Sequence, residues 1–170
     1  MNIKNELLRE HSKPQADKIA AYIGYDLERF QELIELLLDS EYRVSQRAAM
    51  VLSHSVDRHP QLLTPHIERL VKNLRNNVHV AVVRNTVRLL QFIDVPENLI
   101  GETADICFKL MESSDTPIAV KVFSMTVIAN ICEKEPDLKN ELALLIEDQM
   151  PYGSAGFRNR GAKILNKIRC

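Results

Sequence analysis

The amino-acid sequence predicts an all-α solenoid in which pairs of helices stack in a row and share one core. Three observations lead to this prediction. The chain repeats with a period of 37 residues, and glycine is scarce, at five of 170 residues, so long stretches consist of good helix formers. Prolines, which are excluded from helix interiors, stand at the joints between those stretches: Pro60, Pro65, Pro96, Pro117, Pro136 and Pro151.

The repeat is clearest in a column of basic residues with three equal intervals of 37: Arg47, Arg84, Lys121 and Arg158. Three and six residues after each base comes a small or apolar residue, which is the spacing of one inward face on a helix. The same shift aligns an apolar series upstream: Leu33, Leu70, Cys107 and Leu144. Each unit therefore contains two amphipathic helices, and a fixed period of roughly 20 to 50 residues is the signature of a repeat array.

Two short helices are predicted before the first full unit. The first runs from Lys4 to His11, and the second from Pro14 to Ile23, with Ser12 as its N-cap. We expect this pair to cap the array, because a terminal repeat would otherwise expose its apolar face to water. The expected organisation is a cap at 1–25 and a repeat array at 26–170, within a single domain.

Four helix pairs follow the cap. Their boundaries are set by the two apolar series and by the prolines, and the last helix carries five bases without an acid, which would keep its outer side solvated. The predicted helices lie at 26–39, 43–57, 64–76, 78–93, 97–112, 117–133, 137–149 and 155–168.

The second helix of three pairs opens with an apolar residue followed by a base, at Val83-Arg84, Val120-Lys121 and Phe157-Arg158. With the segment from Asp115 to Asn130, this pattern resembles the HEAT repeat of the armadillo-like superfamily, over residues 26–169. The resemblance implies a right-handed α-α superhelix whose second helices line a concave surface, used to bind proteins and sometimes nucleic acid. It implies no reaction. The first unit departs from the pattern, since Gln46 precedes Arg47.

Composition excludes few classes of partner. The formal net charge of −1 and the pI near 6.5 provide no global field for nucleic acid or an anionic membrane. The three cysteines, Cys107, Cys132 and Cys170, are odd in number and widely spaced, which is typical of reduced thiols in the cytoplasm. The amino terminus is polar and no apolar run reaches spanning length, so we expect a cytoplasmic protein without a membrane segment.

Two interpretations of the basic column stay open. In HEAT-like proteins the equivalent base usually bonds to acids and carbonyls of neighbouring units, which would also satisfy charges near the core. Alternatively, the column is a ladder for phosphates, helped by further bases and the terminal basic helix, with binding that weakens steeply with salt. The helping bases are Arg69, Lys72, Arg75 and Arg88.

Other polar groups favour ordinary structural roles. The acidic residues of 26–41 and 133–148 are expected to form solvated faces, with a docking strip for a basic peptide as the alternative. The histidines lack the spacing of a metal site on a helix, and no serine or cysteine has a neighbouring base at a recognisable spacing. The glycine-bearing loop from Pro151 to Arg158 is a turn and helix start, with a weak anion site as the alternative.

The leading hypothesis is a non-catalytic scaffold that binds a protein partner on the surface of the second helices. The candidate contact residues are Arg43, Arg47, His54, Arg84, Arg88, Lys121, Arg158, Arg160 and Lys163. The alternatives are a nucleic-acid binder that uses the basic column, and an enzyme of unknown type on a helical-repeat frame. No catalytic residue, metal or cofactor is predicted, and the sequence leaves open whether two copies associate.

Overall fold

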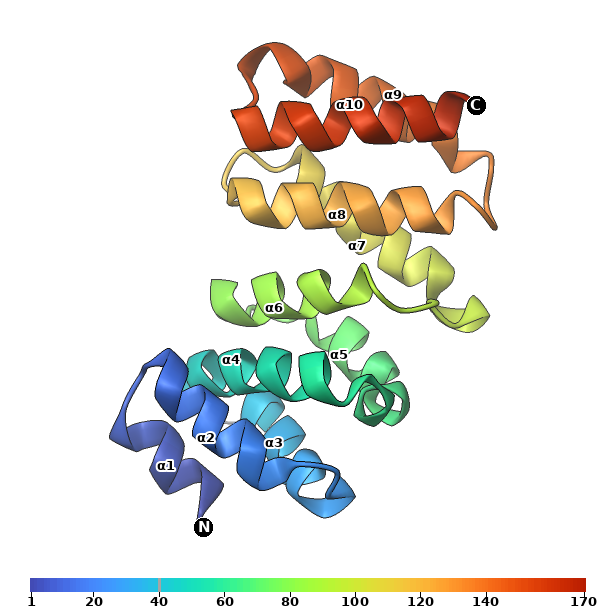
Figure 1. The fold of residues 1–170 in the computed structure, drawn as a ribbon. Coiled ribbons are helices and arrows are strands. Elements are labelled where there is room, and N and C mark those ends of the chain that lie inside the picture. The colour runs from blue at the N-terminus through green and yellow to red at the C-terminus, as the bar shows by residue number, and fades with distance from the viewer. Residues whose placement is uncertain (40) are drawn as a thin grey trace. The chain divides into compact units, whose positions relative to one another are not determined.

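A computed structural model describes residues 1–39 and 41–170. Within these residues the chain forms ten α-helices and four short 3-10 helices, with no strand, so the predicted all-α fold of helix pairs is confirmed (Figure 1). In the same residues no helix is both long enough and apolar enough to cross a lipid bilayer. The handedness of the superhelix stays a prediction.

Two compact units, each longer than one 37-residue repeat, make up the chain: the first unit is Met1–Leu89 and the second unit is Leu90–Cys170. Each unit is built from helix pairs and is described by itself below. The expectation that the cap and the array form one domain stays a prediction.

The first unit begins with the two short helices, α1 (Ile3–Arg9) and α2 (Lys13–Ile23). Ser12 caps α2, because its Oγ accepts a hydrogen bond from the Gln15 amide at 3.2 Å, and the predicted N-cap is thereby confirmed. The other helices of the unit are α3 (Leu27–Asp39), α4 (Tyr42–Arg58), α5 (Ile67–Asn73) and α6 (Val80–Leu90).

The core of the first unit lies where α3 packs against α4 and α2. Phe30, Leu33, Ile34 and Leu37 form the inward stripe of α3 and are buried, as the spacing of three and four residues requires. Leu52 of α4 has no exposed surface. The small and apolar residues that recur along the sequence therefore form the shared core of neighbouring pairs.

The segment before α5 differs from the prediction. Pro60 and Pro65 each stand at the start of a 3-10 turn, η1 (Pro60–Leu62) and η2 (Thr64–His66), and α5 begins only at Ile67 rather than at 64. Both turns close with a hydrogen bond from an amide to the carbonyl oxygen three residues earlier, from Leu63 to Pro60 at 3.1 Å and from His66 to Leu63 at 2.9 Å. Proline is tolerated in the first turn because the amide hydrogen it lacks would have no partner there. The result is a first helix of seven residues, shorter than its equivalents.

The second unit contains α7 (Ile100–Glu112), α8 (Ile118–Ile131), α9 (Leu138–Gln149) and α10 (Ala155–Arg169), with the 3-10 turns η3 (Glu97–Leu99) and η4 (Met150–Tyr152). In Figure 1, α8 and α10 lie side by side in front, with α7 and α9 behind them. Cys107, Met111, Val120 and Ile128 are fully buried between these helices. The buried Val120 and Phe157 keep the 37-residue register of the second helices.

The predicted register is wrong for α9. Leu144, which the 37-residue shift aligns with the buried Leu33 and Cys107, is 59% exposed, while Leu142 and Ile146 are buried instead. Apolar residues occupy every position from 142 to 146, so periodicity alone does not define the inward face. Packing against α10, α8 and α7 selects it.

Candidate functional site

In the first unit, α4 and α6 border a groove of about 360 Å³. Three of the predicted contact residues, His54, Arg84 and Arg88, line this groove together. The other residues that line it are His11, Gln46, Met50, Ser53, Asp57, Ala81 and Asn85. The structure thus brings the second helices of two successive pairs to one polar site.

Most charged side chains around this groove are paired between the second helices of successive pairs. Arg88 Nη2 donates to both carboxylate oxygens of Asp57, at 3.0 Å each, and so links α6 to α4. His54 Nδ1 and Arg58 Nη2 each lie 2.8 Å from Asp17 Oδ1, which links α4 to α2. The hydrogen bond from His54 lowers the pKa of Asp17, and the positive charges nearby lower it further. These side chains are already held in place by their neighbours.

Two polar side chains on the floor of the groove, Ser53 and Asn85, also have hydrogen-bond partners. Ser53 Oγ donates to Asn85 Oδ1 at 2.7 Å, and Asn85 Nδ2 donates to the carbonyl oxygen of Ala81 at 2.8 Å. Because the chain of bonds ends on the backbone of α6, the two side chains are fixed in orientation. They present a rigid polar surface beneath the rim.

Arg84 is the exception among these charges. It is exposed, and it makes no hydrogen bond or ion pair with any residue that the structure describes. A planar guanidinium group of this kind can bind a carboxylate with two parallel hydrogen bonds. The groove therefore has one uncompensated positive group at its edge.

The other two predicted residues of α4 lie outside the groove. Arg47 is half-buried, and its Nη1 donates to the carbonyl oxygen of Leu7 at 2.7 Å, so it ties α4 to the first helix of the chain. This matches the structural interpretation of the basic column. Arg43 is exposed in the first turn of α4 and does not line the groove.

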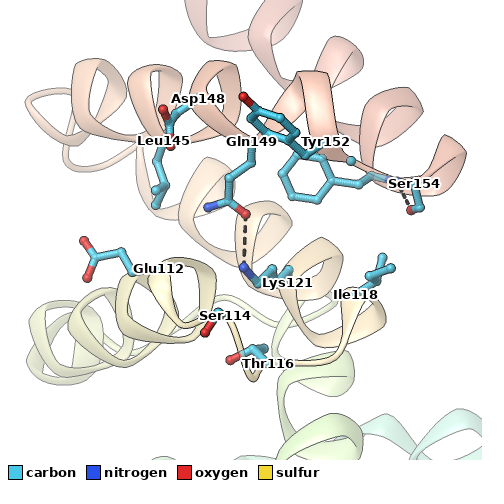
Figure 2. Close-up of a pocket in the computed structure, with 12 residues that line it drawn as sticks. Glu112, Ser114, Thr116, Ile118, Lys121, Leu145, Asp148, Gln149, Tyr152 and Ser154 are labelled. Atoms are coloured by element: carbon cyan, nitrogen blue, oxygen red, sulfur yellow. Dashed lines mark hydrogen bonds between the residues drawn. The ribbon is translucent and has the colours of Figure 1, made fainter.

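In the second unit, Lys121 lines a cavity of about 560 Å³ between the start of α8, the end of α9 and the turn before α10 (Figure 2). Its Nζ donates to Gln149 Oε1 at 3.1 Å, and Gln149 Nε2 donates to the carbonyl oxygen of Met111 at 2.9 Å. Lys121 thus connects two neighbouring pairs, as the structural interpretation expects. Figure 2 also shows the carboxylates of Glu112 and Asp148 at the rim.

The glycine-bearing loop at this cavity is a turn and a helix start. Ser154 Oγ accepts a hydrogen bond from the Phe157 amide at 3.1 Å, which caps α10. A Cβ on Gly153 would lie 2.8 Å from Cδ1 of Phe157, so only glycine leaves room for this buried ring. Tyr152, next to it, is 92% exposed.

Three of the five bases of α10 are engaged. Arg160 Nη1 donates to Thr126 Oγ1 at 2.7 Å, Lys167 lies 2.7 Å from Glu133, and Arg169 pairs with Glu147. Arg158 and Lys163 are exposed and have no partner among the described residues. The basic column is therefore divided, because Arg47 and Lys121 hydrogen-bond to other helices while Arg84 and Arg158 have no partner among the described residues.

The histidine and cysteine side chains are the groups that could bind a metal or act as a nucleophile. No three His, Cys, Asp or Glu side chains gather as a metal site within residues 1–39 and 41–170. His59 stacks against Tyr25, and His66 lies against Phe30. Burial raises the pKa of the Cys107 thiol to about 12, so that group stays protonated at neutral pH.

Sequence reasoning missed the acid and the amide that organise these sites, Asp17 and Gln149. The signal for Asp17 was the period itself, since Asp17 and His54 are 37 residues apart and so occupy equivalent places on successive second helices. Gln149 is 38 residues from Met111, which is nearly the same step. Residues separated by one period are thus the pairs to inspect in such a chain.

A known protein family matches almost the whole chain. The family described as HEAT repeat domain matches residues 3–168. The match includes α1 and α2, which lie before the 26–169 segment that carries the sequence resemblance. No curated protein and no solved structure matches the chain.

Proposed function

Because the chain belongs to the HEAT repeat domain family, whose helical repeats typically mediate protein interactions, we propose that it is a non-catalytic interaction scaffold. In this proposal a partner protein binds the surface lined by the second helices. The proposal places the protein in the cytoplasm, where the free thiols of Cys107, Cys132 and Cys170 would stay reduced.

The observation that carries the proposal is the exposed Arg84 beside a groove whose other charges are already paired. Arginine is enriched among the residues that dominate binding energy at protein interfaces. The fixed neighbours lose little conformational entropy when a partner arrives, which favours binding at this place. An acidic side chain of the partner is the group that fits Arg84.

The nucleic-acid alternative has less support, because three of the bases that would assist the column, Arg69, Lys72 and Arg88, are already paired with carboxylates. Arg69 makes hydrogen bonds of 2.7 and 3.0 Å to the two oxygens of Glu35, and Lys72 Nζ lies 2.5 Å from Glu68. Counterion release requires several bases that are free to neutralise phosphates. Fluorescence anisotropy with duplex and single-stranded oligonucleotides at low and moderate salt tests this alternative. We expect no binding at low salt, and binding that weakens steeply with salt would favour the alternative.

The direct experiment compares Arg84→Glu with a matched charge reversal elsewhere. Lys4 is an exposed base on α1 that has no partner among the described residues, so Lys4→Glu is the control. Both variants should melt like the wild type. Quantitative affinity purification should recover at least one protein with the wild type and with Lys4→Glu, and about tenfold less of it with Arg84→Glu, since a tenfold loss is roughly 1.4 kcal/mol. Equal recovery with both variants would contradict the proposal.

A further inference from the structure

A second groove lies on the first-helix side of the second unit, between α7 and the start of α9. It has a volume of about 600 Å³ and is lined from α7, η3 and the turn before α9. In Figure 1 these helices lie behind α8 and α10, so the groove is separate from the second-helix surface of the same unit. None of the predicted contact residues lines it.

The floor of this groove is apolar. Ile100, Ala104 and Phe108 of α7 are buried, with a small part of each surface bordering the groove, and Leu138 is half-buried at the start of α9. Gly101 also lines the groove and is exposed, and a Cβ at this position would meet nothing within 4 Å. Apolar side chains of a ligand would be removed from water here, which favours binding.

The rim is strongly acidic. Five exposed carboxylates surround the floor and have no partner among the described residues: Glu97, Glu112, Glu135, Asp137 and Glu141. The single base in the lining, Lys109, is 3.0 Å from Asp105 and so does not neutralise them. Repulsion among these carboxylates is relieved when a cationic ligand arrives.

We propose that this groove binds a basic amphipathic helix of a partner protein. The apolar side of that helix would lie on Phe108 and Leu138, and its Lys or Arg side chains would meet the rim. An apolar groove that takes one face of a helix is a recurring mode of peptide recognition. The opposite charges would speed the encounter and orient the segment. This inference does not depend on the second-helix surface proposed above.

The test uses a fluorescein-labelled amphipathic peptide of Leu and Lys, with the full chain titrated against it by fluorescence anisotropy. We expect saturable binding that weakens as salt rises. Two control peptides should bind at least about tenfold more weakly. One has Glu in place of Lys, and the other has the same composition with the Leu residues scattered. Absence of saturable binding, or equal binding of the Glu peptide, would overturn the proposal.

Blocking the groove provides the sharper variant. Gly101→Leu adds a side chain where the fold leaves open space, so it should fill the groove without disturbing the core. Gly156→Leu is the matched control, because Gly156 is also the second residue of its helix and the nearest atom to an added Cβ is Ser154 Oγ at 3.8 Å. We expect Gly101→Leu to weaken peptide binding by about tenfold or more and Gly156→Leu to leave it unchanged. Equal affinity of the two variants would refute the site.

A charge reversal separates this groove from the second-helix surface. Glu141→Lys should weaken binding of the Leu/Lys peptide, whereas Glu10→Lys, at an exposed acid of the first unit, should not. Arg84→Glu should also leave peptide binding unchanged. If Glu10→Lys weakens binding as much as Glu141→Lys, the peptide is recognised by overall charge and the proposed groove is wrong.

Discussion

Val127 tests the register of the helix pairs, because it belongs to the inward stripe of α8 and is only 1% exposed. α8 packs on α7 and on α10, so the side chain lies within the core of the second unit. Val127→Asp replaces this buried side chain with a carboxyl group that has no partner. Ile118→Asp is the control, since Ile118 lies on the same helix and is 54% exposed.

The expected loss is large in comparison with the stability of a small domain. Removing a buried valine from the core costs about 1.5 to 3 kcal/mol, and an unsatisfied buried polar group costs about 1 to 3 kcal/mol more. The sum of about 2.5 to 6 kcal/mol is comparable to the lower end of the stability of a domain, which is roughly 5 to 15 kcal/mol. Burial would also raise the pKa of the new carboxyl group, so the loss should grow by up to about 1.4 kcal/mol for each pH unit above 4.

Urea unfolding followed by circular dichroism measures this effect. We expect a midpoint far below that of the wild type for Val127→Asp, with a further decrease between pH 4 and pH 7, and only a small change for Ile118→Asp. If Val127→Asp unfolds at the same urea concentration as the wild type, then position 127 does not face the core and the assigned register is refuted.

Three further predictions follow from particular contacts. Gly153→Ala should lower stability by about 1 to 3 kcal/mol, because the added Cβ would lie 2.8 Å from the buried ring of Phe157, and an unchanged melting temperature would contradict this contact. Asp17→Asn should destabilise the chain at pH 7. The pKa of Asp17 is lowered in the folded state. The stability that this carboxylate contributes is therefore fully present above its unfolded pKa of about 3.9, and it is lost as the pH falls through its lower folded pKa. The difference between wild type and Asp17→Asn should therefore shrink at low pH, and a constant difference would argue against the ion pair. Finally, Cys107 should resist thiol reagents in the folded chain, and Ile34→Asp in the first unit should make it reactive if the whole chain is one domain. Loss of helix without reaction of Cys107 would separate the two units.

Most helices could be placed from the sequence because their starts and inward faces have local causes. Ser12 is a strong N-cap, and Pro117 stands directly before the first residue of α8. The inward stripe of α3 is a clean series at helical spacing, with polar residues on the other side. In these segments local preference and tertiary packing agree.

The rest depended on packing that local patterns do not encode. The start of α5 lies later than predicted because the segment before it forms two 3-10 turns, which the local pattern does not distinguish from the first turns of an α-helix. The inward face of α9 differs from the prediction because Leu142, Leu144 and Ile146 are all apolar. Only contacts with neighbouring helices decide which of them is buried.

The sequence predicts which basic residues belong to the candidate site, but it does not predict which of them lack a partner. Arg84 and Lys121 hold equivalent positions in the repeat, yet Lys121 donates to Gln149 and Arg84 has no partner among the described residues. Whether a base is paired depends on a residue some 28 to 41 positions away, as for Arg58 and Asp17, and on its exact side-chain geometry. A repeat period indicates where to look for such partners but does not guarantee that one is present.

The central claim is that a partner protein binds the second-helix surface beside Arg84. Affinity purification should identify a protein that the wild-type chain captures and the Arg84→Glu variant does not. Hydrogen–deuterium exchange of the chain, alone and in complex with that protein, tests the claim most directly. The account predicts slower exchange on binding in peptides that cover α4 and α6, residues 42–58 and 80–90. Slower exchange confined to the first helices α3 and α5, with α4 and α6 unchanged, would contradict it.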